Sequence, residues 1–221
     1  MKDYRVSVIE HIETKEWLLK KHYAHRIPSI SFAFGLYDKN ILVGIFTYGV
    51  PASPSLVQGV FGGKHKEIIY ELNRLVTNDD LPRNALSFFV SQTFKLLPQP
   101  LAIVSYSDTS MFHHGYIYQA LNFDYTGLSS AHNEYRIEGI DNKHSRHLFD
   151  SFGGINNMKE SGIEVKEGQR ARKHRYFYFL GNKREKKEML KDLQYPLLPY
   201  PKGNNKNYDA SYSPSIQLTL F

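Results

Sequence analysis

The order of short β-rich runs and helical stretches constrains the fold of this chain more than any other feature of its sequence. An amphipathic stretch from Arg83 to Leu97, with Pro82 before it and Pro98 after it, is typical of a helix. Apolar and β-branched runs on both sides of it are typical of strands. The predicted order is a strand (4–9), a helix (13–21), a hairpin (31–37 and 41–50), a strand (68–76), the helix at 83–97, a strand (101–106), a helix (113–121) and a strand from Asp124. This order predicts an α/β fold in which a mixed central sheet is flanked by helices.

The remaining segments are predicted from turn-forming residues and charge. The stretch from Pro51 to Gly63 holds two prolines and three glycines, which predicts a loop. The triplet at 78–80 (Asn-Asp-Asp) predicts caps for the following helix. After Gly127 the periodicity weakens until a strand at 175–180 and a charged helix at 183–193, and from Pro196 the composition favours an extended tail. We therefore expect a core at 1–130, an extension at 131–195 that completes the fold, and a flexible tail at 196–221.

The composition excludes several classes of protein. There is no cysteine, so disulfides, thiolate nucleophiles and cysteine-held zinc or iron–sulfur sites are excluded, and any metal must be held by His, Asp or Glu. No apolar run approaches the roughly 18 to 20 residues of a membrane-spanning helix. The first four residues lack the apolar stretch of a secretory signal. We expect a cytoplasmic protein with no membrane partner.

The positive charge is concentrated in the second part of the chain. Residues 1–130 carry 12 basic and 11 acidic side chains, whereas residues 131–221 carry 16 and 11, which together give the net charge of +6. Between Lys166 and Lys191 there are ten basic residues against three acidic ones, interleaved with aromatic residues at 176–179. This pattern favours contact with double-stranded DNA, through the side chains of Arg170, Arg172, Lys173 and Arg175. The alternative is a solvated helix face with internal ion pairs at 183–191.

The element order resembles that of the GNAT-like acyltransferases over roughly Tyr4 to Gly127. In that fold the pyrophosphate of coenzyme A binds the amide groups that open the helix after the central strand, where the helix dipole favours an anion. The matching turn here is Asp80-Leu81-Pro82-Arg83-Asn84-Ala85, which contains no glycine. The resemblance implies donor contacts at Arg83, Asn84 and Ala85.

A second group of motifs resembles the phage Mom family of DNA adenine-modification proteins. The motifs are His22-Tyr23-x-x-Arg26, Glu71-Leu72-x-Arg74-Leu75, Ser105-Tyr106-Ser107-Asp108-Thr109, the run from His113 to Gly127, Lys173-His174-Arg175-Tyr176 and Leu198-Pro199-Tyr200-Pro201-Lys202. The resemblance implies conversion of adenine in DNA to N6-carbamoylmethyladenine, which protects phage DNA from host restriction. The donor stays open between acetyl-CoA and another activated two-carbon or glycyl-type compound. Because the amine of a paired adenine is engaged in the duplex, we expect the base to be flipped out of the helix or to be reached in single-stranded DNA.

Arg74 and Asp108 are the leading candidates for catalysis. Arg74 lies near the end of a predicted strand, where a bidentate guanidinium could hold an anionic group of the donor or a phosphate. The alternative is a structural ion pair with Glu71 or Asp108. Asp108 follows a predicted strand and could accept the proton of the attacking amine. The alternative is that Asp108 only caps the helix that follows.

Four further residues complete the predicted site. Tyr118 matches the position of a tyrosine that protonates the leaving group in acyltransferases of this fold, whereas Tyr116 lies two residues away and faces elsewhere on a helix. His22 could act as a base or ligand, Tyr23 could stack on a flipped base and Arg26 could contact phosphate. Core packing of the tyrosines and helix capping by the His-Tyr pair are the competing interpretations.

A metal site is left open by the histidines. His113 and His114 are adjacent, so on a helix their side chains diverge, and a structural or capping role competes with metal binding. An iron or zinc ion held by His22, Asp108 and one of these histidines would need no sequence proximity.

The last five residues, Gln217-Leu218-Thr219-Leu220-Phe221, resemble the peptide by which polymerases and repair proteins bind the bacterial sliding clamp. Leu220 and Phe221 would occupy an apolar cleft and Gln217 a polar pocket, with Leu218 between them. A chance match or an added edge strand are the alternatives. The sequence thus leaves three functions: a DNA-adenine transferase, a coenzyme-A-dependent acyltransferase acting on another amine, and a non-catalytic clamp-associated DNA-binding protein.

Overall fold

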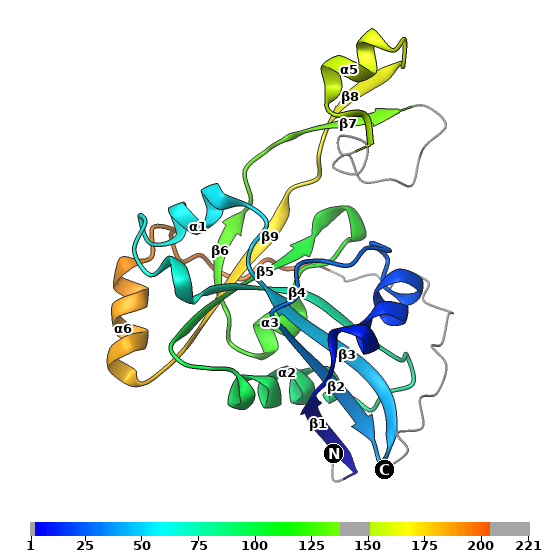
Figure 1. The fold of residues 1–221 in the computed structure, drawn as a ribbon. Coiled ribbons are helices and arrows are strands. Elements are labelled where there is room, and N and C mark those ends of the chain that lie inside the picture. Colours follow the sequence, from blue (N-terminus) through cyan, green and yellow to red (C-terminus); the bar gives the residue numbers. More distant parts are fainter. Residues whose placement is uncertain (1–2, 138–150, 204–221) are drawn as a thin grey trace. The chain divides into compact units, whose positions relative to one another are not determined.

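The computed structural model describes residues 3–137 and 151–203. By its internal contacts the chain divides into unit 1, residues 1–127 with 174–221, and unit 2, residues 128–173. Unit 1 contains a seven-stranded sheet with the order β1-β2-β3-β4-β5-β9-β6 (Figure 1). The strands are β1 (Tyr4–Val8), β2 (Phe32–Asp38), β3 (Ile41–Gly49), β4 (Ile69–Thr77), β5 (Leu101–Asp108), β6 (Asp124–Leu128) and β9 (Lys173–Leu180). The predicted α/β fold with a mixed, helix-flanked sheet is confirmed.

The first four strands form an antiparallel meander, and β4 then pairs in parallel with β5. A parallel pair needs a crossover, and this one contains helix α2 (Ala85–Leu96). Successive residues of a strand point to opposite faces, so each apolar run supplies two layers. On β5, Ile103 packs on one face, and its neighbours Ala102 and Val104 pack on the other.

Helices cover both faces of the sheet. On one face, α2 and α3 (Tyr116–Ala120) pack their apolar side chains against Phe46, Tyr48 and Ile103. The other face is covered at its centre by α1 (Pro54–Val60) and α6 (Lys183–Asp192), and toward β1 by the η1 (His11–Thr14) and η2 (Trp17–Lys21) turns. The core therefore has three layers, helix–sheet–helix (Figure 1).

Two predicted boundaries are wrong for local reasons. Part of the predicted loop at 51–63 is helix α1, which starts because Ser53 Oγ accepts the Leu56 N–H (3.2 Å) and Pro54 occupies the first turn. Helix α2 begins at Ala85, and the triplet at 78–80 does not cap it. The residue before it is Asn84, in the left-handed region at φ 70°, which Asn tolerates better than most side chains.

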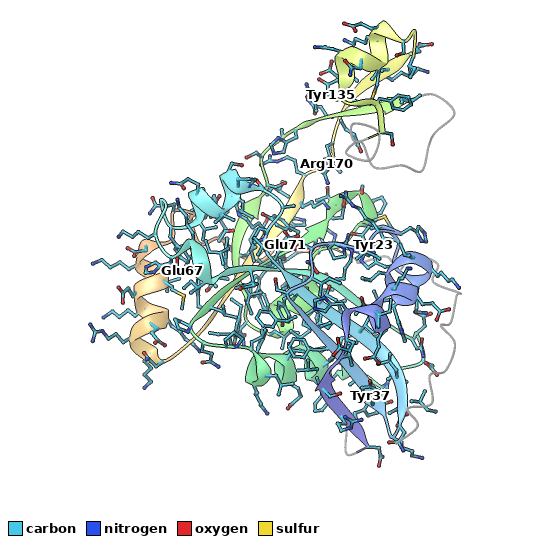
Figure 2. All side chains as sticks on the ribbon, viewed as in Figure 1. Tyr23, Tyr37, Glu67, Glu71, Tyr135 and Arg170 are labelled. Carbon is cyan, nitrogen blue, oxygen red and sulfur yellow. The ribbon has the colours of Figure 1, made fainter. Side chains whose placement is uncertain are left out.

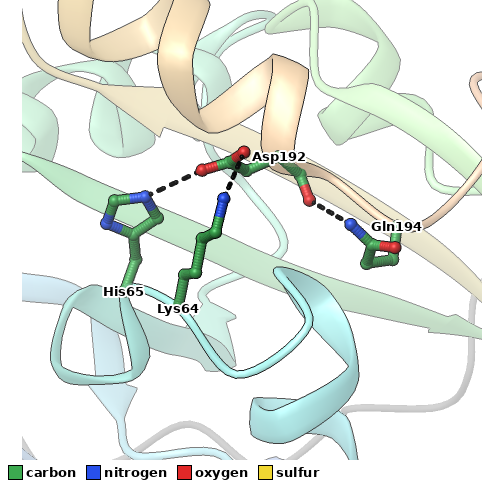
Figure 3. A network of polar contacts seen from close by, with 4 residues as sticks. All are labelled: Lys64, His65, Asp192 and Gln194. Carbon is green, nitrogen blue, oxygen red and sulfur yellow. Dashed lines mark hydrogen bonds and ion pairs between the residues drawn. The ribbon is translucent and has the colours of Figure 1, made fainter.

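The C-terminal part of unit 1 closes the sheet. Strand β9 lies between β5 and β6, and α6 begins with a capping box in which Asn182 accepts N–H groups and Glu185 bonds back to its amide. At the other end of α6, the Asp192 carboxylate accepts a hydrogen bond from Lys64 Nζ (3.0 Å) and forms a second hydrogen bond with His65 Nε2 (3.2 Å) (Figure 3). The Lys64 hydrogen bond is the largest of the effects that lower the pKa of Asp192. These contacts attach α6 to the turn η3 (Lys66–Ile68) that precedes β4.

Residues 196–203 run along β6 in defined contacts, although the sequence predicts that a flexible tail begins at 196. The Leu198 N–H donates to the Tyr125 carbonyl (2.9 Å), and Tyr200 Oη donates to the Phe123 carbonyl (2.8 Å). Proline and tyrosine here supply packing surface rather than flexibility. The contact-based division also differs from the predicted boundaries, because it assigns 174–203 to unit 1.

Unit 2 is a small structure in which β7 (Asn133–Ile137) pairs antiparallel with β8 (Val165–Gln169), and α5 (Ile155–Glu160) packs on them. Its apolar cluster is built on Ile137 and Met158. Weak periodicity and paired glycines hid these elements from the sequence analysis. None of the helices in the described ranges is long and apolar enough to cross a membrane.

Candidate functional site in the opening between two parallel strands

The candidate site lies where β4 and β5 separate. Their ladder runs from Ile69–Ala102 to Leu72–Ser105, yet β4 continues to Thr77 and β5 to Asp108. A β-bulge sits at this point, because Thr47 pairs with Arg74 and Tyr48 with Leu72, which leaves Asn73 as an extra residue. The Asn73 side chain is fixed by the Thr47 hydroxyl (2.6 Å) and by the Ser29 carbonyl (2.8 Å).

The bulge decides which face of the sheet Arg74 shares. In a regular strand, Leu72 and Arg74 would point to the same side. Because of the extra residue, Leu75 points to the same face of the sheet as Leu72, and Arg74 points to the same face as Glu71. The spacing of three between two leucines that share one face was the sequence signal for this bulge.

Arg74 carries a partly unsatisfied guanidinium. Its Nη1 donates to the Asn73 carbonyl (2.6 Å), whereas its buried Nε makes no hydrogen bond within the described part of the chain. Burial lowers the pKa of Arg74, the charges of Tyr23 and Glu71 raise it, and Arg26 lowers it. A buried N–H donor without an acceptor is costly, so this geometry suits an anionic or carbonyl ligand.

Tyr118 reaches the same opening from α3 on the opposite face. Burial raises its pKa to about 12, a hydrogen bond with Ser105 lowers it, and the charges of Tyr23 and Glu71 raise it. The Ser105 hydroxyl itself donates to the Leu72 carbonyl (3.2 Å), the last paired residue of β4. Tyr118 therefore keeps its proton at neutral pH, as a proton donor must. Tyr116 is 42% exposed and donates instead to the Gly203 carbonyl.

Glu71 and Ser105 lie at the candidate site but were not selected by the sequence analysis. Figure 2 labels Glu71 and Tyr23, which belong to β4 and to the segment after η2. Glu71 acts electrostatically on both Arg74 and Tyr118. An acidic residue in a Glu-Leu-x-Arg pattern looks like a surface strand residue until the bulge is known.

The segment after η2 forms one side of the site. His22 is buried, its Nδ1 accepts the Ala24 N–H (3.0 Å), and its ring stacks on Tyr23 (4.4 Å between centroids). A neutral His22 therefore carries its proton on Nε2. Tyr23 is 37% exposed and meets the ring of His113 edge-on, at 6.4 Å. Arg26 is exposed, and its charge acts on Arg74.

Asp108 holds the loop that faces this segment. Its Oδ1 accepts the Ser110 N–H (3.0 Å) and the Ser110 hydroxyl (2.6 Å), so it caps the turn η4 (Thr109–Met111). The Asp108 carbonyl accepts the His113 N–H (3.2 Å). The predicted helix at 113–121 begins only at Tyr116, so both histidines lie in the loop before it. Asp108 thus serves as a cap, and its role as proton acceptor stays a prediction.

The described residues do not assemble a metal site. Within 3–137 and 151–203 there is no group of three or more His, Asp or Glu side chains with metal-binding geometry, so the set of His22, Asp108 and one loop histidine is not brought together there.

The predicted donor turn is formed without glycine. Asn84 takes the left-handed conformation, and the Ala85 N–H is already bonded to the Pro82 carbonyl (3.0 Å). The next amides of the helix lack intrahelical acceptors, as at any helix start, and Arg83 is exposed beside them. Binding of an anionic donor group at this turn stays a prediction.

The predicted DNA contacts fall into two different settings. Arg170, Arg172 and Lys173, here called the basic strip, belong to unit 2, where Arg172 Nε donates to the Ser129 carbonyl (2.6 Å). Arg175 belongs to unit 1 and is only 8% exposed. Its guanidinium bonds Thr126 and lies 3.5 Å from the ring centre of Tyr195. Arg175 is thus buried, and its two-residue spacing from Phe177 and Phe179, which pack in one apolar cluster, was the signal missed. The clamp-like residues Gln217, Leu218, Leu220 and Phe221 lie outside the described residues.

Comparison with known proteins identifies the family. A model of the Mom protein family matches residues 3–202. The chain belongs to the Mom family. It is 27% identical over 215 residues to methylcarbamoylase Mom of Escherichia phage Mu, with 91% of this chain and 85% of that protein covered.

Solved structures similar to this Mom-family protein include two acetyltransferases. An N-acetyltransferase from Staphylococcus aureus has a TM-score of 0.44 at 10% identity and covers 81% of this chain and 99% of its own. A GNAT-family acetyltransferase from Bacillus cereus has a TM-score of 0.40 at 11% identity, with the same coverage of both chains.

Proposed function

We propose that this Mom-family protein transfers a carbamoylmethyl group to the exocyclic amine of adenine in double-stranded DNA, in the cytoplasm of the phage's host, and so protects the DNA from restriction. Membership of a family that contains a methylcarbamoylase carries this proposal. The opening between β4 and β5 supports it, because it gathers a cation, a protonated hydroxyl and an exposed aromatic ring, from Arg74, Tyr118 and Tyr23.

In the proposed reaction the adenine amine attacks the activated carbon of a two-carbon or glycyl-type donor. The new N–C bond forms as the bond to the donor's leaving group breaks. Asp108 accepts the amine proton, and Tyr118 gives its proton to the leaving group. Arg74 binds the anionic part of the donor through its unsatisfied Nε. A donor whose leaving group is bonded to the CH2 of a –CH2–CO–NH2 unit would supply the electrophile, whereas acetyl-CoA alone would deliver an acetyl group. Arg83, Asn84 and Ala85 would hold an anionic part of that donor.

Glu71 contributes to the electrostatics of this arrangement. Its negative charge raises the pKa of Tyr118, after the larger effects of burial and of Tyr23. The same charge helps to keep Arg74 positive against the opposing effect of burial. His22 supports the ring of Tyr23 by stacking, which leaves Tyr23 in place to stack on an extruded adenine.

The test is mass spectrometry of nucleosides from DNA of cells that express the full chain. The expected result is a new adenosine species with the mass of the N6-carbamoylmethyl form, absent with Arg74→Ala and present with Arg5→Ala. Arg5 is a fair control because its guanidinium lies over the ring of Tyr37 (4.7 Å), on the outer strand β1. Unmodified DNA from every variant, in a host that supports another Mom-family enzyme, would contradict the proposal.

A non-catalytic clamp-associated function makes the opposite prediction. It requires that Arg74→Ala leave function intact while loss of the basic strip abolishes it. A coenzyme-A-dependent acyltransferase on another amine would instead leave DNA unmodified and acylate protein or a small amine.

A further inference from the structure

Ser107 is a buried polar residue whose hydroxyl has no partner in the fold. The residue is only 4% exposed, and its Oγ makes no hydrogen bond within the described part of the chain. Buried hydroxyls are nearly always paired, because a buried group that has given up its hydrogen bonds to water gains nothing in exchange when it is left alone. A hydroxyl of this kind suits a polar group that arrives with a ligand.

Ser107 is one of three such residues near the point where β4 and β5 separate. Arg74, whose Nε is unpaired, lies on β4 beyond the last paired residue, and Asn78, whose Oδ1 is unpaired, directly follows that strand. Ser107 lies on β5, two residues beyond Ser105, which is the partner of Leu72 at the end of the ladder. Continued by two residues along both strands, this register would place Arg74 opposite Ser107. The two residues therefore flank the opening between the strands.

The Ser107 hydroxyl lies on the α3 side of the sheet. Because side chains alternate along a strand, Ser107 shares the face of Ser105, which is hydrogen-bonded to Tyr118. A Cβ atom placed on Gly115 would lie 2.6 Å from Ser107 Oγ and 2.6 Å from a ring carbon of Tyr176. Gly115 directly precedes α3, and the ring centroids of Tyr118 and Tyr176 are 5.2 Å apart. Ser107 thus lies against the start of the helix that supplies Tyr118.

We propose that the Ser107 hydroxyl binds the carboxamide of the transferred group and so selects a carbamoylmethyl group. The inference rests on the proposed function. A –CH2–CO–NH2 unit brings an acceptor oxygen and two N–H donors into a buried site, and these need partners. A hydroxyl can accept from an N–H and donate to an oxygen, so Ser107 can bind either end of the amide. A donor whose group ends in a methyl would leave the hydroxyl unpaired and would bind less tightly.

The proposed reaction brings the carboxamide to this side of the sheet. The carbon that the adenine amine attacks carries both the leaving group and the carboxamide, so these two groups lie within a few bonds of each other. Tyr118 gives its proton to the leaving group from the α3 face, which is also the face of Ser107. Arg74 points to the opposite face, where it binds the anionic part of the donor. The two faces of the opening therefore hold different parts of one donor.

The first test compares stability with modification in the same variants. Ser107→Ala removes a hydroxyl that has no partner in the fold, so Tm is expected to stay unchanged or to rise. The same variant is expected to leave roughly threefold to tenfold less modified adenosine in the DNA of cells that express it, the effect of one lost hydrogen bond. Ser107→Cys keeps the side-chain volume but bonds weakly, so it is expected to behave like Ser107→Ala. Ser91→Ala, which removes a hydroxyl that bonds the Phe88 carbonyl within α2 (2.8 Å), is the matched control and should modify DNA like wild type.

The second test uses acetamide as the carboxamide probe. Purified, isotope-labelled full-length protein is titrated with acetamide, and the backbone amide signals of Ser107 and Gly115 are followed by NMR. The wild-type protein is expected to show saturable shifts of both signals. Ser107→Ala and Ser107→Cys are expected to raise the apparent Kd for acetamide by roughly threefold to tenfold, whereas Ser91→Ala should leave it unchanged.

The proposal is overturned if acetamide causes no saturable shift in the wild-type protein, or if Ser107→Ala binds acetamide as tightly as wild type does. It is also overturned if Ser107→Cys restores wild-type modification, because the side chain would then only fill space, or if Ser107→Ala loses modification together with a large drop in Tm. Absence of modified adenosine with the wild-type protein would contradict the proposed function instead, and the acetamide titration would still decide whether Ser107 binds a carboxamide.

Discussion

Substitution of Asp108 by asparagine separates the two roles that this residue could have. The structure shows a cap, in which Oδ1 accepts two donors from Ser110. The proposed chemistry adds a proton acceptor, which an amide cannot be. Asparagine is as good a cap as aspartate, whereas alanine removes the acceptor altogether. Asp108→Asn is therefore expected to keep the hydrogen bonds that cap the loop and to lose the proton acceptor, whereas Asp108→Ala loses both.

The magnitudes of the two effects differ enough to be resolved. Loss of a cap costs about 1 kcal/mol, so Asp108→Ala is expected to lower Tm by about 3 °C for a chain of this size. Asp108→Asn is expected to shift Tm by less than half of that. Loss of a general base lowers a rate by roughly 100-fold to 10,000-fold, so both variants should leave little modified adenosine.

The assay pairs nucleoside mass spectrometry with thermal unfolding of the purified variants. Ser110→Ala is the control for the loop, since it removes the 2.6 Å hydroxyl bond and keeps the carboxylate and the backbone donor. It is expected to modify DNA nearly as well as wild type. If Asp108→Asn retained wild-type modification while Asp108→Ala lost it, Asp108 would be a cap only. Glu71 would then be the carboxylate to test as proton acceptor.

Three further predictions follow from burial and charge. Burial, with smaller effects of Tyr23 and Glu71, raises the pKa of Tyr118 to about 12, against about 10 in the unfolded chain. The contribution of Tyr118 to stability is therefore complete below about pH 10 and is lost as the pH rises toward 12. Tyr118→Phe should reduce this alkaline loss of stability by on the order of 2 kcal/mol, measured by denaturant unfolding at each pH. Replacement of the basic strip by alanine should reduce the slope of log K against log salt for duplex binding by up to about 0.9 per lost phosphate contact. An unchanged slope would show that the basic strip does not contact DNA. The matched control replaces three lysines of α6, Lys183, Lys186 and Lys187. Leu220→Ala with Phe221→Ala should abolish binding of the full chain to a purified bacterial sliding clamp in surface plasmon resonance, and retention of binding would refute the clamp prediction.

Most of the sheet could be predicted from the sequence because its strands are marked locally. Alternating apolar runs and turn residues locate β1 to β6 to within a few residues. The start of α2 could not be found in this way, because an asparagine in the left-handed conformation replaces the expected side-chain cap. Unit 2 was missed because its apolar cluster rests on few residues, chiefly Ile137 and Met158, so no periodicity builds up.

The candidate site was predicted only in part, because side-chain direction depends on long-range pairing. Motif matches selected Arg74, Tyr118 and Tyr23, and Tyr23 raises both the pKa of Arg74 and the pKa of Tyr118. Arg175 looked equivalent to its basic neighbours, yet it is buried because it shares a face of β9 with Phe177 and Phe179, which pack in an apolar cluster. Nothing local to Glu71 distinguishes it from a surface carboxylate.

The bulge at Asn73 explains why Arg74 and Glu71 share one face of the sheet. Without the extra residue, Arg74 would share the face of Leu72 and would compete with the apolar core for space. With it, Arg74 and Glu71 share the opposite face, and the β4–β5 ladder ends at Leu72 and Ser105. Tyr118 reaches that same ladder end from α3 through its contact with Ser105. A single inserted residue, fixed by Thr47 and Ser29, thus keeps the Arg74 cation out of the apolar core and on the face of Glu71, at the end of a ladder that Tyr118 reaches from the other face.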